Sequence, residues 1–185
     1  MRIENVYDAF PIVDCGNYIL RPVLEKDREK VFEIYSNEEV VKYQATKVFR
    51  SMEESDQAIK RFKNAYDSQN SIKWCIADKA NDEMIGLISL HHIDCKNNNA
   101  QIGYYLRKEL WNKGIMSKLV KDYIEYLFEK WEIEKLEVSI HPENLSSIRL
   151  AEKLGFEKEG LRRRCVINPE TKKYEDRILM GLLKK

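Results

Sequence analysis

Hydrophobic positions recur along the chain with two different periods, and this predicts helices and strands in a mixed order. Apolar residues three and four positions apart indicate amphipathic helices. Shorter apolar runs bounded by polar turn residues indicate strands. The predicted helices cover residues 25–37, a segment that begins at Ser51, and residues 115–131 and 144–154. The predicted strands cover residues 18–23, 72–78, 84–93, 100–106, 135–140, 156–167 and 173–183.

The order of these elements favours an α+β domain. It reads β-α-α-β-β-β-α-β-α-β-β, and the three consecutive strands over residues 72–106 are separated by short polar turns, which predicts an antiparallel meander. The sequence therefore predicts a largely antiparallel central sheet of about seven strands flanked by about four helices. Ser51 and Glu54 have the spacing of a capping box at the start of the second helix.

Length and charge limit the classes of partner. A chain of 185 residues fits one domain over residues 1–185, with residues 1–14 as a candidate loosely held N-terminal arm. With 32 basic and 31 acidic residues, the net charge of +1 favours neither a nucleic-acid partner nor a membrane surface. The chain has no long apolar run and no signal-peptide pattern, so we expect a cytoplasmic location. The four cysteines are scattered singly, which predicts reduced thiols and no zinc site.

Residues 107–117 form a polar turn between a predicted strand and the long helix, and they are a candidate anion site. A helix start exposes unpaired backbone N–H groups, and Gly114 would let a phosphate approach the backbone closely. Lys113 would add a positive charge. The turn has neither a Walker sequence nor a dinucleotide-binding glycine pattern. Taken alone, it could equally be a simple turn that leads into a helix.

A second stretch, residues 141–156, has a polar helix entrance and a Gly-Phe exit. With the first stretch, it resembles the GNAT superfamily of acyl-CoA-dependent N-acyltransferases, and within it the branch of ribosomal-protein N-terminal acetyltransferases. The resemblance covers nearly the whole chain. It depends on Leu20-Arg21-Pro22, Ile85-Gly86, residues 101–106 (Gln-Ile-Gly-Tyr-Tyr-Leu), residues 111–116 (Trp-Asn-Lys-Gly-Ile-Met), Asn144-x-x-Ser147, residues 153–156 (Lys-Leu-Gly-Phe) and Tyr174-x-Asp176.

This resemblance implies a GNAT-type fold with acetyl-CoA as co-substrate and no metal. It also implies that the strands bearing Tyr104 and Val138 diverge, and that Ser147 lies near the thioester sulfur as a candidate acid. Asn144 would bond to the cofactor or to the acceptor. The residues expected to bind the cofactor are Tyr104, Tyr105, Leu106, Trp111, Asn112, Lys113, Gly114, Ile115, Met116, Ser117, Asn144 and Ser147.

The general base is less well defined by the resemblance. An amine attacks the thioester directly, so the protein must position two substrates and accept a proton. The family often has a glutamate where this chain has Gln101. We regard His141 as a candidate base because an imidazole has an intrinsic pKa of about 6.5. The alternative is that His141 is simply a surface histidine ahead of a proline, with no role in catalysis.

The predicted function is transfer of an acetyl group from acetyl-CoA to a primary amine, with the N-terminal amine of a ribosomal or other protein as the first candidate. The alternatives are a small amine, such as a polyamine, an aminoglycoside or an amino acid, and a CoA-binding module without turnover. The enzyme would be a monomer or a homodimer. His91, His92 and Cys95 are interpreted as packing or substrate contacts, because adjacent strand residues point to opposite faces.

Overall fold

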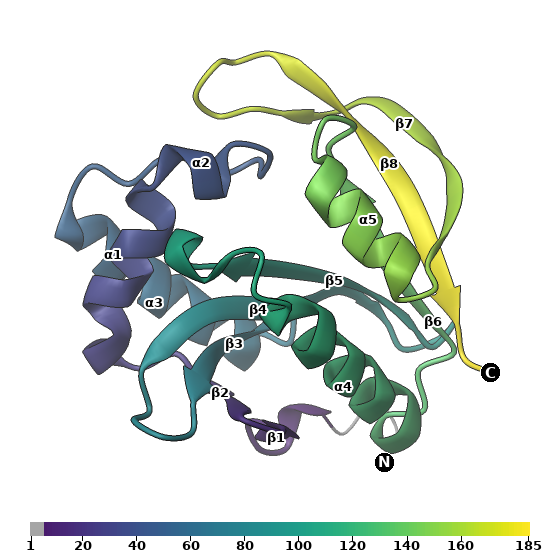
Figure 1. Cartoon of the computed structure of the whole chain (residues 1–185), viewed down its shortest axis with the longest axis horizontal. Helices are drawn as coiled ribbons and strands as arrows, with labels where there is room; N and C mark the ends of the chain where they lie inside the picture. The colour runs from purple at the N-terminus through teal and green to yellow at the C-terminus, as the bar shows by residue number, and fades with distance from the viewer. Residues whose placement is uncertain (1–5) are drawn as a thin grey trace.

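The computed structural model describes residues 6–185, which form one twisted sheet with helices on both faces (Figure 1). Across these residues the sheet has eight strands in the order β1-β2-β3-β4-β5-β6-β8-β7. The strands are β1 Val13–Cys15, β2 Tyr18–Pro22, β3 Ser71–Asp78, β4 Met84–Asp94, β5 Asn99–Leu106, β6 Lys135–Ile140, β7 Glu157–Ile167 and β8 Tyr174–Leu183. All neighbours pair antiparallel except β5 and β6.

The helices divide between the two faces of the sheet. Over the described residues they are α1 Arg28–Ser36, α2 Glu38–Val41, α3 Met52–Asp67, α4 Ile115–Lys130 and α5 Leu145–Lys153, with single 3-10 turns at Glu25–Asp27 and Lys108–Leu110. One hydrophobic cluster joins α1, α2 and α3 to the sheet, and another joins α4 and α5 to its opposite face. None of the helices within residues 6–185 is long and apolar enough to cross a membrane.

Strands β3 and β4 contribute to both clusters, which explains their nearly continuous apolar sequences. Trp74 and Ile88 pack on the α4 side, while Cys75 and Leu87 pack on the α1 side. Successive side chains of a strand point to opposite faces, so a central strand covered on both sides needs apolar residues at nearly every position. These two strands form the buried centre of the sheet, and β5 pairs with β4 along one side of it.

The parallel pair β5 and β6 separates along its length. The two strands pair only at Asn99↔Lys135, Ala100↔Leu136 and Gln101↔Glu137. Beyond that point β6 continues to pair with β8 as far as Ile140, and β5 continues with β4 as far as Leu106. The predicted divergence of the strands bearing Tyr104 and Val138 is therefore confirmed, and it opens a gap in the middle of the sheet (Figure 1).

The predicted fold class and element order are confirmed, with two additions. The sequence pattern missed β1 and α2, which are short and have too few residues to show a period. The expectation of a loosely held arm over residues 1–14 is wrong for residues 6–14, because Val6 and Val13 are buried and the Trp74 indole donates to Pro11 O at 2.7 Å. The part of that arm over residues 1–5 lies outside the described residues.

The Leu20-Arg21-Pro22 motif has a structural role. Arg21 makes two hydrogen bonds to the buried Asp27 carboxylate, at 2.8 and 2.9 Å, and a third to Asp82 at 2.7 Å. A bidentate pair of this kind fixes the geometry of both partners. It holds the start of α1 against the turn between β3 and β4.

Candidate active site

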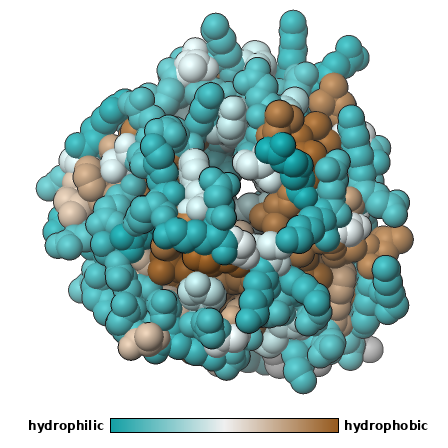
Figure 2. Space-filling model, viewed as in Figure 1, coloured by the Kyte–Doolittle hydropathy of each residue, from teal (hydrophilic) through white to brown (hydrophobic). Residues whose placement is uncertain are grey.

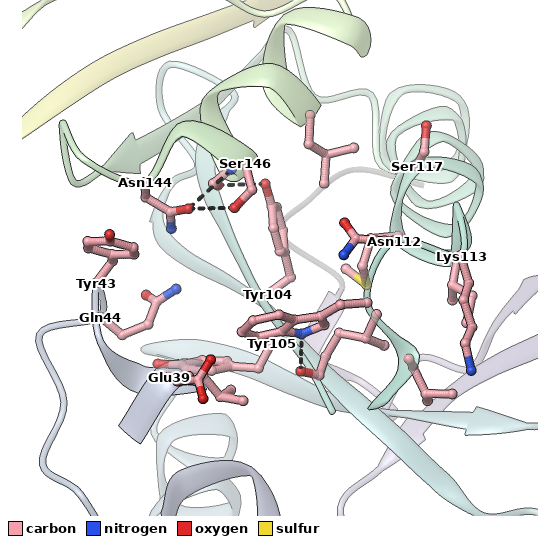
Figure 3. A pocket seen from close by; sticks show the side chains of 18 of the residues that line it. Glu39, Tyr43, Gln44, Tyr104, Tyr105, Asn112, Lys113, Ser117, Asn144 and Ser146 are labelled. Atoms are coloured by element: carbon pink, nitrogen blue, oxygen red, sulfur yellow. Dashed lines mark hydrogen bonds between the residues drawn. The ribbon is translucent and has the colours of Figure 1, made fainter. Parts of the chain in front are cut away.

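A cavity of about 520 Å³ opens where β5 ends and where α4 and α5 begin. Figure 2 shows a hollow near the centre of this face, with hydrophobic side chains along part of its rim. In Figure 3, Tyr43 and Gln44 lie on one side of this main cavity, and Lys113 and Ser117 lie on the opposite side. The walls therefore come from segments far apart in the sequence, on both sides of the gap between β5 and β6.

The twelve residues expected to bind a cofactor all line the main cavity. They are Tyr104, Tyr105, Leu106, Trp111, Asn112, Lys113, Gly114, Ile115, Met116, Ser117, Asn144 and Ser147. The structure thus brings together two stretches that the sequence only suggested were linked. Their role in binding stays a prediction.

The turn before α4 is shaped by two residues with positive φ. Asn112 has a φ of 59° and Gly114, the N-cap of α4, has a φ of 75°. The Trp111 indole donates to Leu106 O at 2.9 Å and so ties this turn to the end of β5. A Cβ built at Gly114 would meet no protein atom within 4 Å, so the space over its backbone is open to a ligand.

The start of α4 is electropositive. Its first turn has no acidic residue and no side chain caps it, so its first backbone N–H groups lack a side-chain acceptor within the described chain. The exposed Lys113 lies beside it. Arg107 is less available to a ligand, because it forms ion pairs with Glu33, Glu83 and Glu109. The helix start and Lys113 therefore offer the positive potential on this side of the cavity.

The opposite wall is the start of α5. The Asn144 side-chain oxygen caps this helix, accepting from the Ser147 backbone N–H at 3.2 Å and from the Ser146 hydroxyl at 3.0 Å. This cap holds Ser147 where its hydroxyl meets that of Tyr104, with the two oxygens 2.9 Å apart (Figure 3). The Ser147–Tyr104 pair bridges the gap between α5 and β5.

Tyr104 is a neutral hydroxyl at ordinary pH. Burial raises its pKa above the usual 10.0, although the hydrogen bond with Ser147 opposes this effect. Either hydroxyl of the pair can donate to the other. A proton for a leaving group could therefore come from Ser147 directly, with Tyr104 behind it.

His141 lies near this pair but not in the main cavity. It lines a small adjoining space of about 40 Å³ between β5 and β6, together with Tyr104 and Ser147. Its Nδ1 accepts from the Glu143 backbone N–H at 3.2 Å, and its ring packs on that of Tyr43 with centroids 5.2 Å apart. The Nδ1 atom is therefore engaged in a hydrogen bond within its own loop.

Gln101 lines neither the main cavity nor the small space beside His141. It is buried, and its side-chain amide donates to Glu137 across the last paired position of β5 and β6, at 3.1 Å. The family often has a glutamate at this position. In this chain Gln101 instead links β5 to β6 just before the two strands diverge.

Sequence reasoning missed the lining residues in α2 and in the loop that follows it. Glu39, Tyr43 and Gln44 line the main cavity, but only four residues of α2 are helical, so no hydrophobic period marks this segment. One signal was present, because Asn37 caps α2 by accepting from the Glu39 and Val40 N–H groups.

The cysteines have no place in this chemistry. All four are free, and burial raises the pKa of both Cys15 and Cys75 to about 12. Across residues 6–185, no three His, Cys, Asp or Glu side chains gather in a way that could hold a metal ion.

Comparison with known proteins identifies the family. Residues 17–157 match the acetyltransferase (GNAT) domain. The chain belongs to the GNAT family. This GNAT chain is 32% identical over 154 residues to the uncharacterized N-acetyltransferase YoaA of Bacillus subtilis, a match that covers 83% of this chain and 87% of YoaA. The GNAT domain and relatives named as N-acetyltransferases make this protein an N-acetyltransferase.

Two further matches carry names that specify a ligand. The structure of RimL, a ribosomal-protein α-N-acetyltransferase in complex with coenzyme A, superposes with a TM-score of 0.80 at 19% identity, covering 94% of this chain and 98% of RimL. The spermidine N(1)-acetyltransferase of Vibrio cholerae is 22% identical over 141 residues, covering 76% of this chain and 79% of that enzyme. The first match supports the fold alone, and the two names point to different acceptors.

Proposed function

We propose that this GNAT enzyme transfers an acetyl group from acetyl-CoA to a primary amine by direct attack, with the N-terminal amine of a protein as the first candidate acceptor. The observation that carries the proposal is the convergence of three elements on one cavity: the open backbone at Gly114, the free edge of β5 and the Ser147–Tyr104 pair. Near these elements a polyanion, an extended arm and a leaving thiolate each find a complementary group.

The residues present fit acetyl-CoA in a definite orientation. The pyrophosphate would lie at the start of α4, where backbone N–H groups from Gly114 onward and Lys113 offer positive potential. The pantetheine arm would follow β5 past Leu106 and Tyr105, where the strand has no partner on the β6 side. The thioester would then lie close to Tyr104 and Ser147.

The chemistry needs one bond made and one broken. The lone pair of a neutral amine attacks the thioester carbonyl carbon, and the carbon–sulfur bond breaks as the carbonyl re-forms. Ser147 gives its proton to the departing thiolate, the nitrogen loses a proton to water or to a base, and Ser147 regains a proton from that source, so that the net change moves one proton from the amine to the thiol. Holding the two substrates in the correct relative orientation supplies a large part of the rate enhancement.

The protein acceptor is supported by the name of RimL, and the small-molecule alternative is supported by the name of the spermidine enzyme. A cytoplasmic location and a monomeric or homodimeric state remain predictions that belong with this proposal.

The test is calorimetry with acetyl-CoA, followed by a CoA-thiol release assay over a panel of peptides and amines. We expect micromolar binding and turnover with at least one amine. Gly114→Asp should weaken acetyl-CoA binding tenfold or more, because a carboxylate would stand in the open space beside the pyrophosphate. Gly114→Asn is the matched control, since it places a neutral side chain of nearly the same size at the same positive φ of 75° and so keeps the backbone strain while omitting the charge.

Each result has a clear interpretation. Binding without transfer to any amine would leave a CoA-binding module. Absence of binding would contradict the proposal entirely. Equal affinity of Gly114→Asp and the unchanged protein would remove the α4 turn from the cofactor site.

A further inference from the structure

A second cavity, of about 410 Å³, lies against the face of the sheet that α1 and α3 cover. We call it the sheet-face pocket. Strands β3, β4 and β5 form its floor with Lys73, His91 and Gly103, and α3 contributes Arg61 and Phe62 to its wall. The main cavity and the sheet-face pocket share Gln44, Tyr104 and Tyr105. A molecule in the sheet-face pocket can therefore extend an end toward the proposed position of the thioester.

The charge in this pocket has one sign. It is lined by Lys73 and Arg61, and no carboxylate side chain lines it within residues 6–185. The pocket is therefore locally positive, although the chain as a whole is nearly balanced with 32 basic and 31 acidic residues. Polar neutral groups, among them Ser89 and His91, complete the polar part of the lining.

Lys73 is held without a counter-charge. Its ammonium lies over the rings of Phe62 and Tyr105, at 4.8 and 5.5 Å from their centroids, and donates to the Tyr35 hydroxyl at 3.3 Å. Burial lowers the pKa of Lys73 and the positive charge of Arg61 adds to this, although Tyr105 partly opposes the shift. The net lowering of the pKa means that the ammonium is less stable here than in water. A bound anion would remove this cost.

We infer that the acceptor amine carries a carboxylate or phosphate group, which binds between Lys73 and Arg61 while the amine reaches the thioester beside Tyr104. This inference rests on the proposed function and names the acceptor class for it. The anion could belong to a small amine or to an acidic residue close to a protein N-terminus. Polycationic amines are disfavoured, because a second ammonium would face two like charges in a partly dry pocket.

The experiment uses acceptors in matched pairs that differ in charge. The small-molecule pair is phosphoethanolamine and ethanolamine. The peptide pair consists of two ten-residue peptides. One begins Ser-Asp-Glu and the other Ser-Asn-Gln, and the remaining seven residues are the same in both. Spermidine is the polycation. We expect the anionic member of at least one pair to have a kcat/KM at least tenfold above that of its neutral partner and of spermidine, and the pair that responds identifies the source of the anion.

Variants connect this preference to the pocket. Arg61→Gln should raise KM for the preferred anionic acceptor about tenfold and leave that for the neutral partner and for acetyl-CoA unchanged, as expected for loss of one charge-assisted contact. Lys73→Gln should do the same, and the exposed position of Arg61 keeps the test valid if Lys73→Gln fails to fold. Lys60→Gln is the matched control, one residue away on α3 and outside the pocket lining.

Calorimetry with the same acceptors, in the presence of CoA, separates this inference from the proposed function. Anionic acceptors that bind more tightly than their neutral partners, with the preference lost in Arg61→Gln, support the inference even if no acetyl group is transferred. Equal binding within every pair, or the same preference in Arg61→Gln and Lys73→Gln as in the unchanged protein, overturns it even if transfer is efficient.

Discussion

At the scale of single residues, the Ser147–Tyr104 pair defines where chemistry is expected. The two hydroxyls are 2.9 Å apart and come from elements on opposite sides of the gap in the sheet. The cap of α5 and the contact with Tyr104 hold the Ser147 hydroxyl in one position, which general acid catalysis requires.

Ser147→Ala should lower kcat by on the order of 10² or more with little change in the affinity for acetyl-CoA, because general acid catalysis typically contributes on the order of 10² to 10⁴ in rate. Steady-state kinetics and calorimetry measure the two effects separately. Tyr104→Phe, which keeps the ring and removes the second hydroxyl, should have a smaller effect on kcat. Equal losses of kcat and acetyl-CoA affinity in Ser147→Ala would make Ser147 a binding residue instead.

His91 provides a pH-dependent contribution to stability. Burial, the neighbouring His92 and the Lys73 charge lower the pKa of His91 from 6.5 to about 4 in the folded protein. In the unfolded chain, His91 therefore binds a proton as the pH falls below 6.5. In the folded protein it binds that proton only near pH 4. Stability is retained above pH 6.5 and is lost as the pH falls from 6.5 toward 4.

His91→Gln should remove this dependence. The free energy of unfolding of the unchanged protein, relative to that of His91→Gln, should fall by about 2 kcal/mol between pH 7 and pH 4, after allowance for a half-buried side chain. Urea unfolding at a series of pH values measures it. His92→Gln, an exposed neighbour, should retain most of the dependence. Parallel curves for the unchanged protein and His91→Gln would contradict the assignment.

At the scale of elements, the sequence predicted the helices and strands that are long enough to show a hydrophobic period, and it missed the short ones. The long helix α4 has five buried apolar residues on one face, and β6 was predicted with its observed bounds. The two missed elements, β1 and α2, have three and four residues, and tertiary pairing holds them in place. Long-range packing of this kind leaves no local pattern in the sequence.

The candidate site was likewise predictable in one part and not in the other. Its cofactor side lies in two continuous stretches around Gly114 and Ser147, so a family resemblance could locate it. The sheet-face pocket is assembled from one to three residues of each of α1, α3, β3, β4 and β5, among them Lys73 and His91, and from the loop after α2. No short sequence motif connects such residues, and only the pairing of the strands brings them together.

The cap of α5 tests how an element positions a catalytic group. Asn144→Ala should lower the free energy of unfolding by about 1 kcal/mol, a typical loss for an N-cap. It should also lower kcat, because the first turn of α5 holds Ser147 beside Tyr104. Thermal unfolding and steady-state kinetics measure these changes.

Two control variants make the origin of the effect clear. Asn144→Asp keeps an oxygen in the capping position and should restore most of the stability. Ser146→Ala removes only an exposed hydroxyl that donates to Asn144 and should be nearly neutral. If Asn144→Ala were as stable as the unchanged protein, the cap would not be what holds Ser147 in place.

At the scale of the whole molecule, distant parts of the chain meet around the site. Glu170, in the turn between β7 and β8, accepts from the Val48 backbone N–H at 2.9 Å, a contact between residues 122 positions apart. In Figure 1 this hairpin arches toward α2. The next residue, Phe49, lines the sheet-face pocket, so the hairpin supports a wall of the proposed acceptor site.

Glu170→Ala should therefore raise KM for the acceptor several-fold while the affinity for acetyl-CoA stays the same, because the affected wall borders the sheet-face pocket alone. The unfolding free energy should change by less than about 1 kcal/mol, since Glu170 is exposed. Thr171→Ala, in the same turn, is the control. An unchanged KM for the acceptor would show that the hairpin has no influence on that wall.

The short pairing between β5 and β6 has a mechanical consequence. Within residues 6–185, the strand pairing that joins the five-stranded part of the sheet to the part made of β6, β8 and β7 is limited to three residue pairs, although one hydrophobic cluster also spans both parts. A co-substrate lying in the gap would touch both parts and couple them. Saturation with acetyl-CoA should therefore do more than raise the unfolding free energy. It should make the two parts of the sheet unfold in a single cooperative transition, because the ligand would bridge the strands where β5 and β6 are unpaired.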